Sequence, residues 1–80
     1  MKKIVVGNWK MMGHASMAHP LVQAVAGCAG GAEVILCPPA TLLAQVKTWL
    51  AGSDIGLGGQ DCSGQPDGAY TGDISAAMLK

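Results

Sequence analysis

The sequence predicts an α/β fold with a parallel sheet, because short apolar runs alternate with segments of helical periodicity. The predicted strands are residues 3–7 (KIVVG), 33–37 (EVILC) and 55–59 (IGLGG). The first two contain almost continuous Val, Ile and Leu, which is typical of strands covered on both faces. The third is weaker, because three of its residues are glycine, which has no side chain to pack. The order strand, helix, strand, helix, strand gives two βαβ units.

The first helix is predicted over residues 20–29. Pro20 suits a first helical turn, and the glycines at 30 and 31 provide a stop. An earlier start at Ser16 would place Pro20 at the edge of what a first turn tolerates. Helical spacing predicts an apolar face made of Leu21, Val22, Val25, Cys28 and Ala29.

The second helix is predicted from Thr41, whose hydroxyl suits an N-cap, to Gly52. Its predicted apolar face consists of Leu42, Leu43, Val46, Trp49 and Leu50. Residues 61–72 then form a loop rich in Gly, Pro, Asp and Ser, and such length often marks a working loop. A third helical segment begins over residues 74–80, with Asp73 and Ser75 near its positive end. Three strands and a helix just begun predict the first part of a larger domain.

The composition argues against several kinds of partner. Five basic and five acidic side chains balance, which indicates neither a nucleic-acid partner nor a membrane surface. No stretch approaches the ~18 apolar residues of a membrane span, and the first apolar run is too short for a signal peptide. Cys28, Cys37 and Cys62 form no C-x-x-C pair, so we expect reduced and mostly buried thiols. We therefore expect a cytoplasmic protein.

Motifs for cofactors and metals are incomplete. Gly56 and Gly58 follow a strand, but the third glycine of a dinucleotide fingerprint should stand at position 61, which is Asp61. His14 and His19 are five residues apart, which is the wrong spacing for one helical face, and no carboxylate or thiol motif joins them. We expect no metal and no cofactor.

Polar residues follow the first predicted strand, where the working groups of a parallel α/β protein gather. Lys10 can neutralise an anionic substrate and stabilise negative charge that develops on oxygen. Asn8 can orient a substrate by hydrogen bonding. Position alone favours a solvated lysine and a turn asparagine.

Several motifs carry a resemblance to a known family. They are GNWKM at residues 7–11, CPP at 37–39, GQD at 59–61, GAYTG at 68–72 and ISAAMLK at 74–80. In this order and spacing, the whole chain resembles triosephosphate isomerase, whose fold is the (β/α)₈ barrel of typically ≈ 250 residues. The resemblance implies that residues 1–80 are a partial, N-terminal βαβαβ portion of a TIM barrel, with strands one to three, helices one and two, and the start of helix three.

The resemblance also implies an activity. The family interconverts dihydroxyacetone phosphate and D-glyceraldehyde 3-phosphate through an enediolate, in glycolysis and gluconeogenesis, without metal or organic cofactor. By this resemblance Lys10 and Asn8 bind the substrate and support catalysis. The family is itself a well-known example of a glutamate base that works with a neutral histidine. His14, His19 and Glu33 match neither residue, so we expect the 80 residues alone to be inactive.

The resemblance further implies a homodimer, in which the third loop of one subunit enters a pocket beside the strand-one loop of its neighbour. Thr71 would then approach the neighbour's Asn8 and Lys10. The interface residues implied are Met11, Met12, Gln60, Asp61, Tyr70, Thr71 and Gly72. Met12 stands where the family usually has asparagine. Asp61 stands where many members of the family have asparagine.

Two other functions stay open. One is a non-enzymatic fragment that associates with full-length subunits through its third loop. The other is a doubly wound binding domain for a phosphorylated ligand, which the βαβ pattern permits and the missing glycine fingerprint disfavours.

Overall fold

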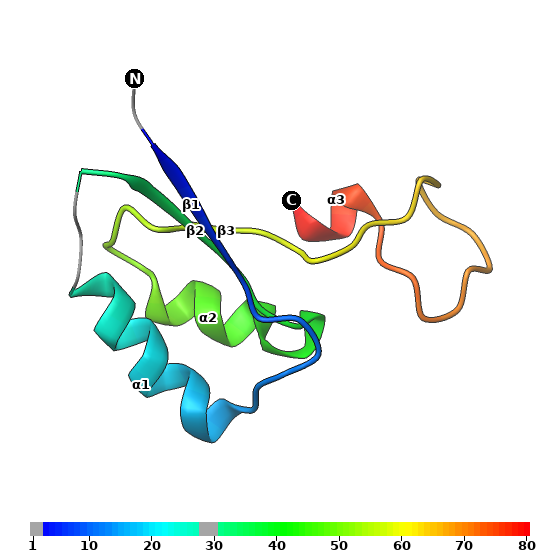
Figure 1. Cartoon of the computed structure of the whole chain (residues 1–80). Coiled ribbons are helices and arrows are strands. Elements are labelled where there is room, and N and C mark those ends of the chain that lie inside the picture. The colour runs from blue at the N-terminus through cyan, green and yellow to red at the C-terminus, as the bar shows by residue number, and fades with distance from the viewer. Residues whose placement is uncertain (1–2, 28–30) are drawn as a thin grey trace.

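The computed structural model describes residues 3–27 and 31–80, in which strands and helices alternate as predicted (Figure 1). The elements in chain order are β1 (Ile4–Asn8), α1 (Ala15–Ala26), β2 (Glu33–Cys37), the 3₁₀ helix η1 (Ala40–Leu42), α2 (Leu43–Trp49), β3 (Gly56–Leu57) and α3 (Ala76–Leu79). The predicted α/β class is therefore confirmed. β1 and β2 lie within one residue of their predicted bounds, whereas β3 is shorter than predicted.

The three strands form one parallel sheet in the order β1-β2-β3. Asn8, the last residue of β1, lies opposite Cys37, the last residue of β2. Helices α1 and α2 lie side by side on one face of this sheet (Figure 1). The carboxyl ends of neighbouring strands therefore meet at one edge, as a parallel sheet requires.

The core lies between the sheet and these two helices. Its buried apolar residues are Ala18, Val22, Leu36, Leu42, Val46 and Leu50. Val22 of α1 and Val46 of α2 are completely buried, and Leu36 brings β2 into contact with them. By contrast, Ile4, Val5 and Val6 of β1 are more than half exposed.

Helix α1 differs from its prediction, because it begins at Ala15 and contains Pro20 within it. Proline removes the hydrogen bond that its own N–H would donate to the carbonyl of Ser16, and the exposed position of Ser16 lets water replace that donor. The earlier start adds Ala18 to the buried face. The predicted face is confirmed for Val22, which is buried, and for Val25, which packs against the core, and it is wrong for Leu21. Leu21 is 38% exposed. Cys28, Ala29 and Gly30 of that prediction lie outside the described residues.

The start of the second helix also differs. Thr41 lies inside η1 and makes no capping hydrogen bond, so the predicted N-cap is wrong. The 3₁₀ turn begins after Pro39, whose carbonyl accepts a hydrogen bond from Leu42 N at 2.9 Å. The predicted apolar face is confirmed for Leu42, Val46 and Leu50, which are all buried.

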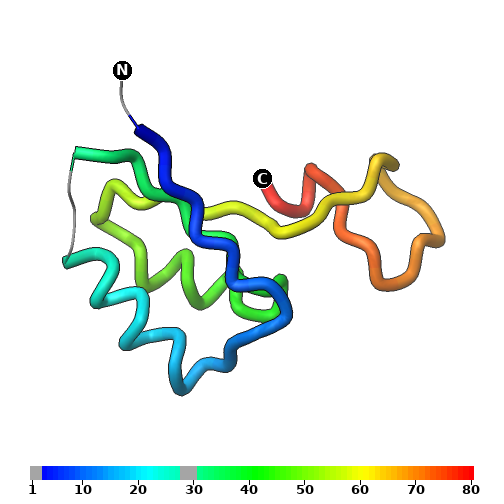
Figure 2. Tube along the Cα trace, viewed as in Figure 1, coloured from blue at the N-terminus to red at the C-terminus, as the bar shows by residue number. Residues whose placement is uncertain are grey.

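The predicted third helical segment is present as α3. Its N-cap is Ser75, whose Oγ accepts a hydrogen bond from Met78 N at 3.2 Å. The loop between β3 and α3 extends away from the sheet and the other helices (Figure 2). This loop closes at its base, where Ser63 N donates to Ile74 O at 2.8 Å.

The cysteine prediction is correct only in part. Cys37 is half-buried and Cys62 is exposed, and both are free thiols, so the expected burial is wrong for Cys62. Cys28 lies outside the described residues. None of the helices in the described ranges is long and apolar enough to cross a membrane.

Candidate functional site

The chain after β1 is anchored by Trp9. Its backbone N–H donates to the carbonyl of Cys37 at 3.1 Å, which extends the pairing of β1 and β2 by one bond. Its indole packs against the hydrophobic core. Asn8 and Lys10, on either side of this anchor, are therefore exposed at the carboxyl edge of the sheet.

Asn8 and Lys10 form a tight local turn. Asn8 Oδ1 accepts a hydrogen bond from Lys10 N at 2.8 Å. Lys10 has a φ of 57°, and it is the only residue other than glycine with a positive φ in the described ranges. This left-handed conformation costs an ordinary side chain about 1–3 kcal/mol, so it persists only where surrounding contacts hold it.

A second contact holds Lys10 from the chain segment that follows β3. Gln60, which follows β3, donates from Nε2 to Lys10 O at 2.9 Å and to Cys37 O at 2.8 Å. A primary amide nitrogen carries two protons, so one group satisfies both carbonyls. The chain segments that follow β1 and β3 and the end of β2 are thus joined through one side chain.

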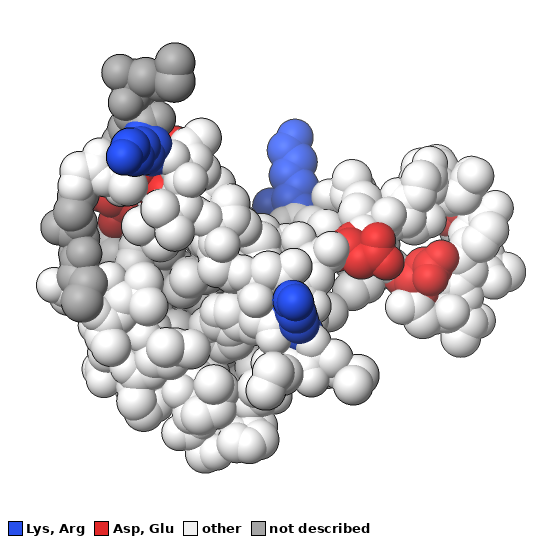
Figure 3. All heavy atoms as spheres, viewed as in Figure 1, with Lys and Arg blue, Asp and Glu red and all other residues white. Residues whose placement is uncertain are grey.

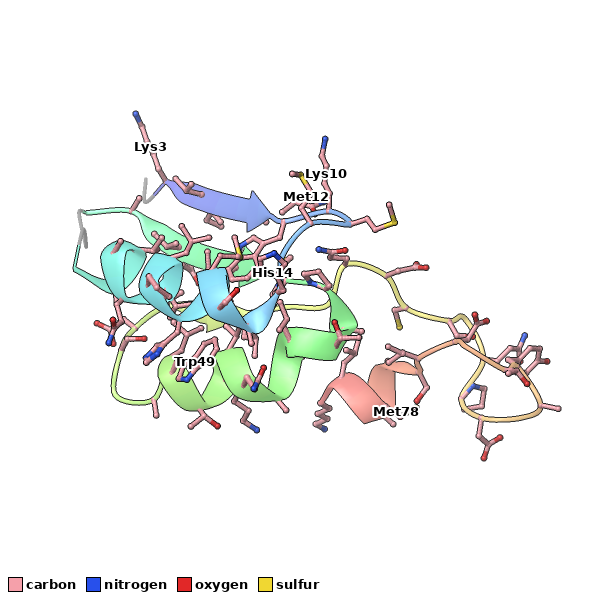
Figure 4. The ribbon with its side chains drawn as sticks, turned by 90° about the horizontal axis from the view of Figure 1, so that it is seen from below. Lys3, Lys10, Met12, His14, Trp49 and Met78 are labelled. Carbon is pink, nitrogen blue, oxygen red and sulfur yellow. The ribbon has the colours of Figure 1, made fainter. Side chains whose placement is uncertain are left out.

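The Lys10 side chain extends away from the helices, as does Lys3 at the opposite end of β1 (Figure 4). In Figure 3 the lysine side chains stand apart from one another on a face that is largely uncharged. An ammonium group at the carboxyl edge, beside the amide of Asn8, can bind an anionic ligand and stabilise negative charge on its oxygen.

The other ionisable candidates do not join this site. Glu33 pairs with Ile4 at the amino ends of the strands, which is the opposite edge of the sheet from Lys10. His14 precedes α1, and its Nδ1 lies 3.0 Å from Ser16 Oγ. His19 stacks on Trp49 of α2, with ring centroids 4.6 Å apart.

The residues expected at a subunit interface are exposed in this chain. Met11 is 96% and Met12 is 72% exposed beside Lys10 (Figure 4 labels Met12). Asp61 Oδ1 accepts a hydrogen bond from Cys62 N at 2.8 Å. The projecting loop carries the half-exposed Tyr70, the exposed Thr71 and Gly72, whose φ is 90°. Their role at an interface stays a prediction.

An open pocket of ≈ 380 Å³ lies between the projecting loop and α3. Its lining includes Gln65, Tyr70 and Met78, whereas Asn8 and Lys10 lie elsewhere. This pocket is therefore separate from the candidate site at the carboxyl edge.

The bridging role of Gln60 was not predicted from the sequence, which placed this residue only among the implied residues of a subunit interface. Its partners are backbone carbonyls of residues 23 and 50 positions away. The one available signal was its position directly after the third predicted strand, where parallel strand ends meet.

A parallel sheet covered by helices, with polar residues in the loop at its carboxyl edge, places this chain in the α/β class, in which functional sites lie in the loops that follow the strands. Comparison with known proteins identifies the family. The family model described as triosephosphate isomerase matches residues 3–80. The chain belongs to the triosephosphate isomerase family.

Individual proteins that match this chain are also triosephosphate isomerases. The chain is 47% identical over 83 residues to a triosephosphate isomerase of Granulibacter bethesdensis, covering 99% of this chain and 33% of that protein. It is 46% identical over 76 residues to one of Alcanivorax borkumensis, covering 95% and 30%. The crystal structure of triosephosphate isomerase from Bartonella henselae matches with a TM-score of 0.90 and 42% identity, covering 99% of this chain and 33% of that one. The chain spans about a third of the length of these relatives, and its fold is an incomplete portion of the TIM barrel.

Proposed function

We propose that residues 1–80 form part of a triosephosphate isomerase, which interconverts dihydroxyacetone phosphate and D-glyceraldehyde 3-phosphate. The observation that carries the proposal is the doubly held backbone of Lys10 at the carboxyl edge of the sheet. A left-handed lysine held by two side chains from different parts of the chain is more than a solvated surface residue requires.

In this proposal Lys10 and Asn8 bind the substrate directly. Isomerisation moves a proton between two adjacent carbons, and negative charge builds on the substrate oxygens in the enediolate. The Lys10 ammonium stabilises this charge and that of the phosphate. Asn8 uses Oδ1 to hold Lys10 N, so its Nδ2 amide remains to donate to the substrate.

The proton-transfer groups come from another part of the complete barrel. Glu33 lies at the amino ends of the strands, opposite the edge that carries Lys10. His14 precedes α1, and His19 lies within α1 and stacks on Trp49. We therefore propose that residues 1–80 alone do not isomerise triose phosphates, and that no metal or organic cofactor is needed.

We also propose a homodimer in the cytoplasm. The exposure of Met11 and the projection of the β3–α3 loop support the dimer, because both present contact surface to a second subunit. The free thiols of Cys37 and Cys62 are compatible with a reducing compartment.

A chimera tests the activity. Residues 1–80 replace the matching segment of the Granulibacter bethesdensis relative, and the purified chimera is assayed for isomerisation in both directions. We expect turnover that depends on the chimera and is absent for residues 1–80 alone. A folded, dimeric chimera without activity would contradict the proposal.

Residues 1–80 alone also test the alternative of a non-enzymatic fragment that binds full-length subunits. Residues 1–80 are mixed with the intact relative and analysed by size-exclusion chromatography. A stable complex of the two, together with an inactive chimera, would favour a binding role for this chain.

A further inference from the structure

The backbone of Lys10 is held at both of its polar groups. Its N–H donates to Asn8 Oδ1 at 2.8 Å, and its carbonyl accepts from Gln60 Nε2 at 2.9 Å. Two side chains on opposite sides of one residue therefore fix its peptide planes, and its φ of 57° is the conformation they fix.

The two contacts are not equivalent. Asn8 is two residues from Lys10, so its hydrogen bond shapes the turn but does not tie that turn to the rest of the sheet. Gln60 is fifty residues away and also binds Cys37 O, which itself accepts from Trp9 N. Trp9 already ties the turn to β2, and Gln60 is thus the contact that ties it to the segment after β3.

The chemistry of the contact makes it specific for an amide. Both partners of Gln60 are carbonyl oxygens, which only accept, so the side chain must present a donor. An ionised carboxylate of the same size would face two carbonyls without a proton to share. A methionine of similar length would fill the space and leave both carbonyls without this donor.

We propose that Gln60 is a positioning residue for the Lys10 ammonium. The inference rests on the proposed isomerase function and adds to it: Gln60 acts on the reaction through the backbone of Lys10 and does not touch the substrate. A displacement of about 1 Å at a catalytic group can cost about 100-fold in rate, so the predicted effect is measurable.

The test uses Gln60→Met in the chimera described above, with Gln45→Met as the matched control. Gln45 is exposed on α2 and receives the same substitution. We expect Gln60→Met to lower kcat by about 10- to 100-fold and kcat/KM by at least as much, because Lys10 acts on charge that develops in the transition state and also on the charge of the bound phosphate. Gln45→Met should match the parent chimera.

Protein concentration separates positioning from dimer stability. Loss of dimer contacts alone would make the activity of Gln60→Met recover as its concentration rises, whereas a misplaced Lys10 stays misplaced in every dimer. Full recovery at high concentration, or activity equal to that of the parent at all concentrations, would overturn the inference.

Gln60→Glu provides a second variant of nearly the same size, should methionine disturb folding. A protonated carboxyl group can donate one hydrogen bond and an ionised one cannot, so its activity relative to the parent should rise as the pH falls toward carboxyl protonation. A ratio independent of pH would count against the inference. An inactive parent chimera would instead contradict the proposed function, so the two failures are distinguishable.

Discussion

Gln60 Nε2 lies 2.9 Å from the carbonyl oxygen of Lys10, although the two residues are 50 positions apart in the sequence. The same nitrogen lies 2.8 Å from the carbonyl of Cys37. The chain segments that follow β1 and β3 are therefore joined to each other and to the end of β2. The position of Lys10 therefore depends on all three strands of the sheet.

Removal of the Lys10 charge should abolish most activity of the chimera. We expect Lys10→Met to lower kcat/KM by about 100- to 1,000-fold, the usual cost of losing one group that stabilises transition-state charge. Lys47→Met is the matched control, since Lys47 is exposed on α2. Steady-state kinetics measure kcat/KM of both variants. Equal values for the two would contradict the placement of Lys10 in the site.

Two substitutions of Asn8 separate its two roles. Asn8→Asp keeps an acceptor for Lys10 N, removes the Nδ2 donor and adds a negative charge. We expect this variant to fold with a melting temperature near that of the parent and to bind inorganic phosphate more weakly, because like charges repel. Asn8→Ala also loses the acceptor, so its melting temperature should fall. The opposite order of melting temperatures would show that the Asn8–Lys10 bond contributes nothing.

Gly13 has a φ of +123°, a conformation that side chains rarely adopt. A Cβ at this position would also lie 3.5 Å from both Leu42 and Trp9. We expect Gly13→Ala to destabilise the chimera by about 1–3 kcal/mol, measured by urea unfolding at a fixed protein concentration. Gly64→Ala is the control, because nothing lies within 4 Å of its added Cβ and its φ is not positive. Equal midpoints for the two variants would show that the turn after Lys10 accommodates a side chain.

The strands were predictable because their pattern is local. Residues 33–37 are an apolar run with clear limits, and they match β2 residue for residue. The start of α1 was not predictable in the same way. Its N-cap, His14, makes no side-chain capping bond, and Pro20 pointed to a later start. Tertiary packing of Ala18 and Val22 against the sheet selected the helix face.

The candidate site was predictable in part. Position after a strand and family motifs identified Asn8 and Lys10, because chemistry-bearing residues occur there in parallel α/β proteins. The contact of Gln60 with Lys10 was not predictable. Hydrogen bonds between residues so far apart in sequence depend on strand order and register, which no short pattern records.

Packing of α1 against the sheet makes a further prediction. Val22 is completely buried, so Val22→Ala should lower the free energy of unfolding of the chimera by about 2 kcal/mol, from lost burial and the cavity left behind. Gln23→Ala, an exposed neighbour on the same helix, should cost almost nothing. Urea midpoints at one protein concentration measure both, and a small effect at Val22 would contradict the observed core.

The exposed apolar surface of β1 should make residues 1–80 associate when they are produced alone. Ile4, Val5 and Val6 are 61%, 54% and 55% exposed. Within the described ranges β1 pairs with β2 alone, so an open strand edge lies beside uncovered side chains. Val5→Lys places a charge on this strand and should shift the population toward monomer in light-scattering measurements. Ala44→Lys adds the same charge on the exposed side of α2 and should leave association unchanged. A monodisperse monomer with a sharp, cooperative thermal transition would contradict this prediction, because it would show that the three strands bury enough surface by themselves.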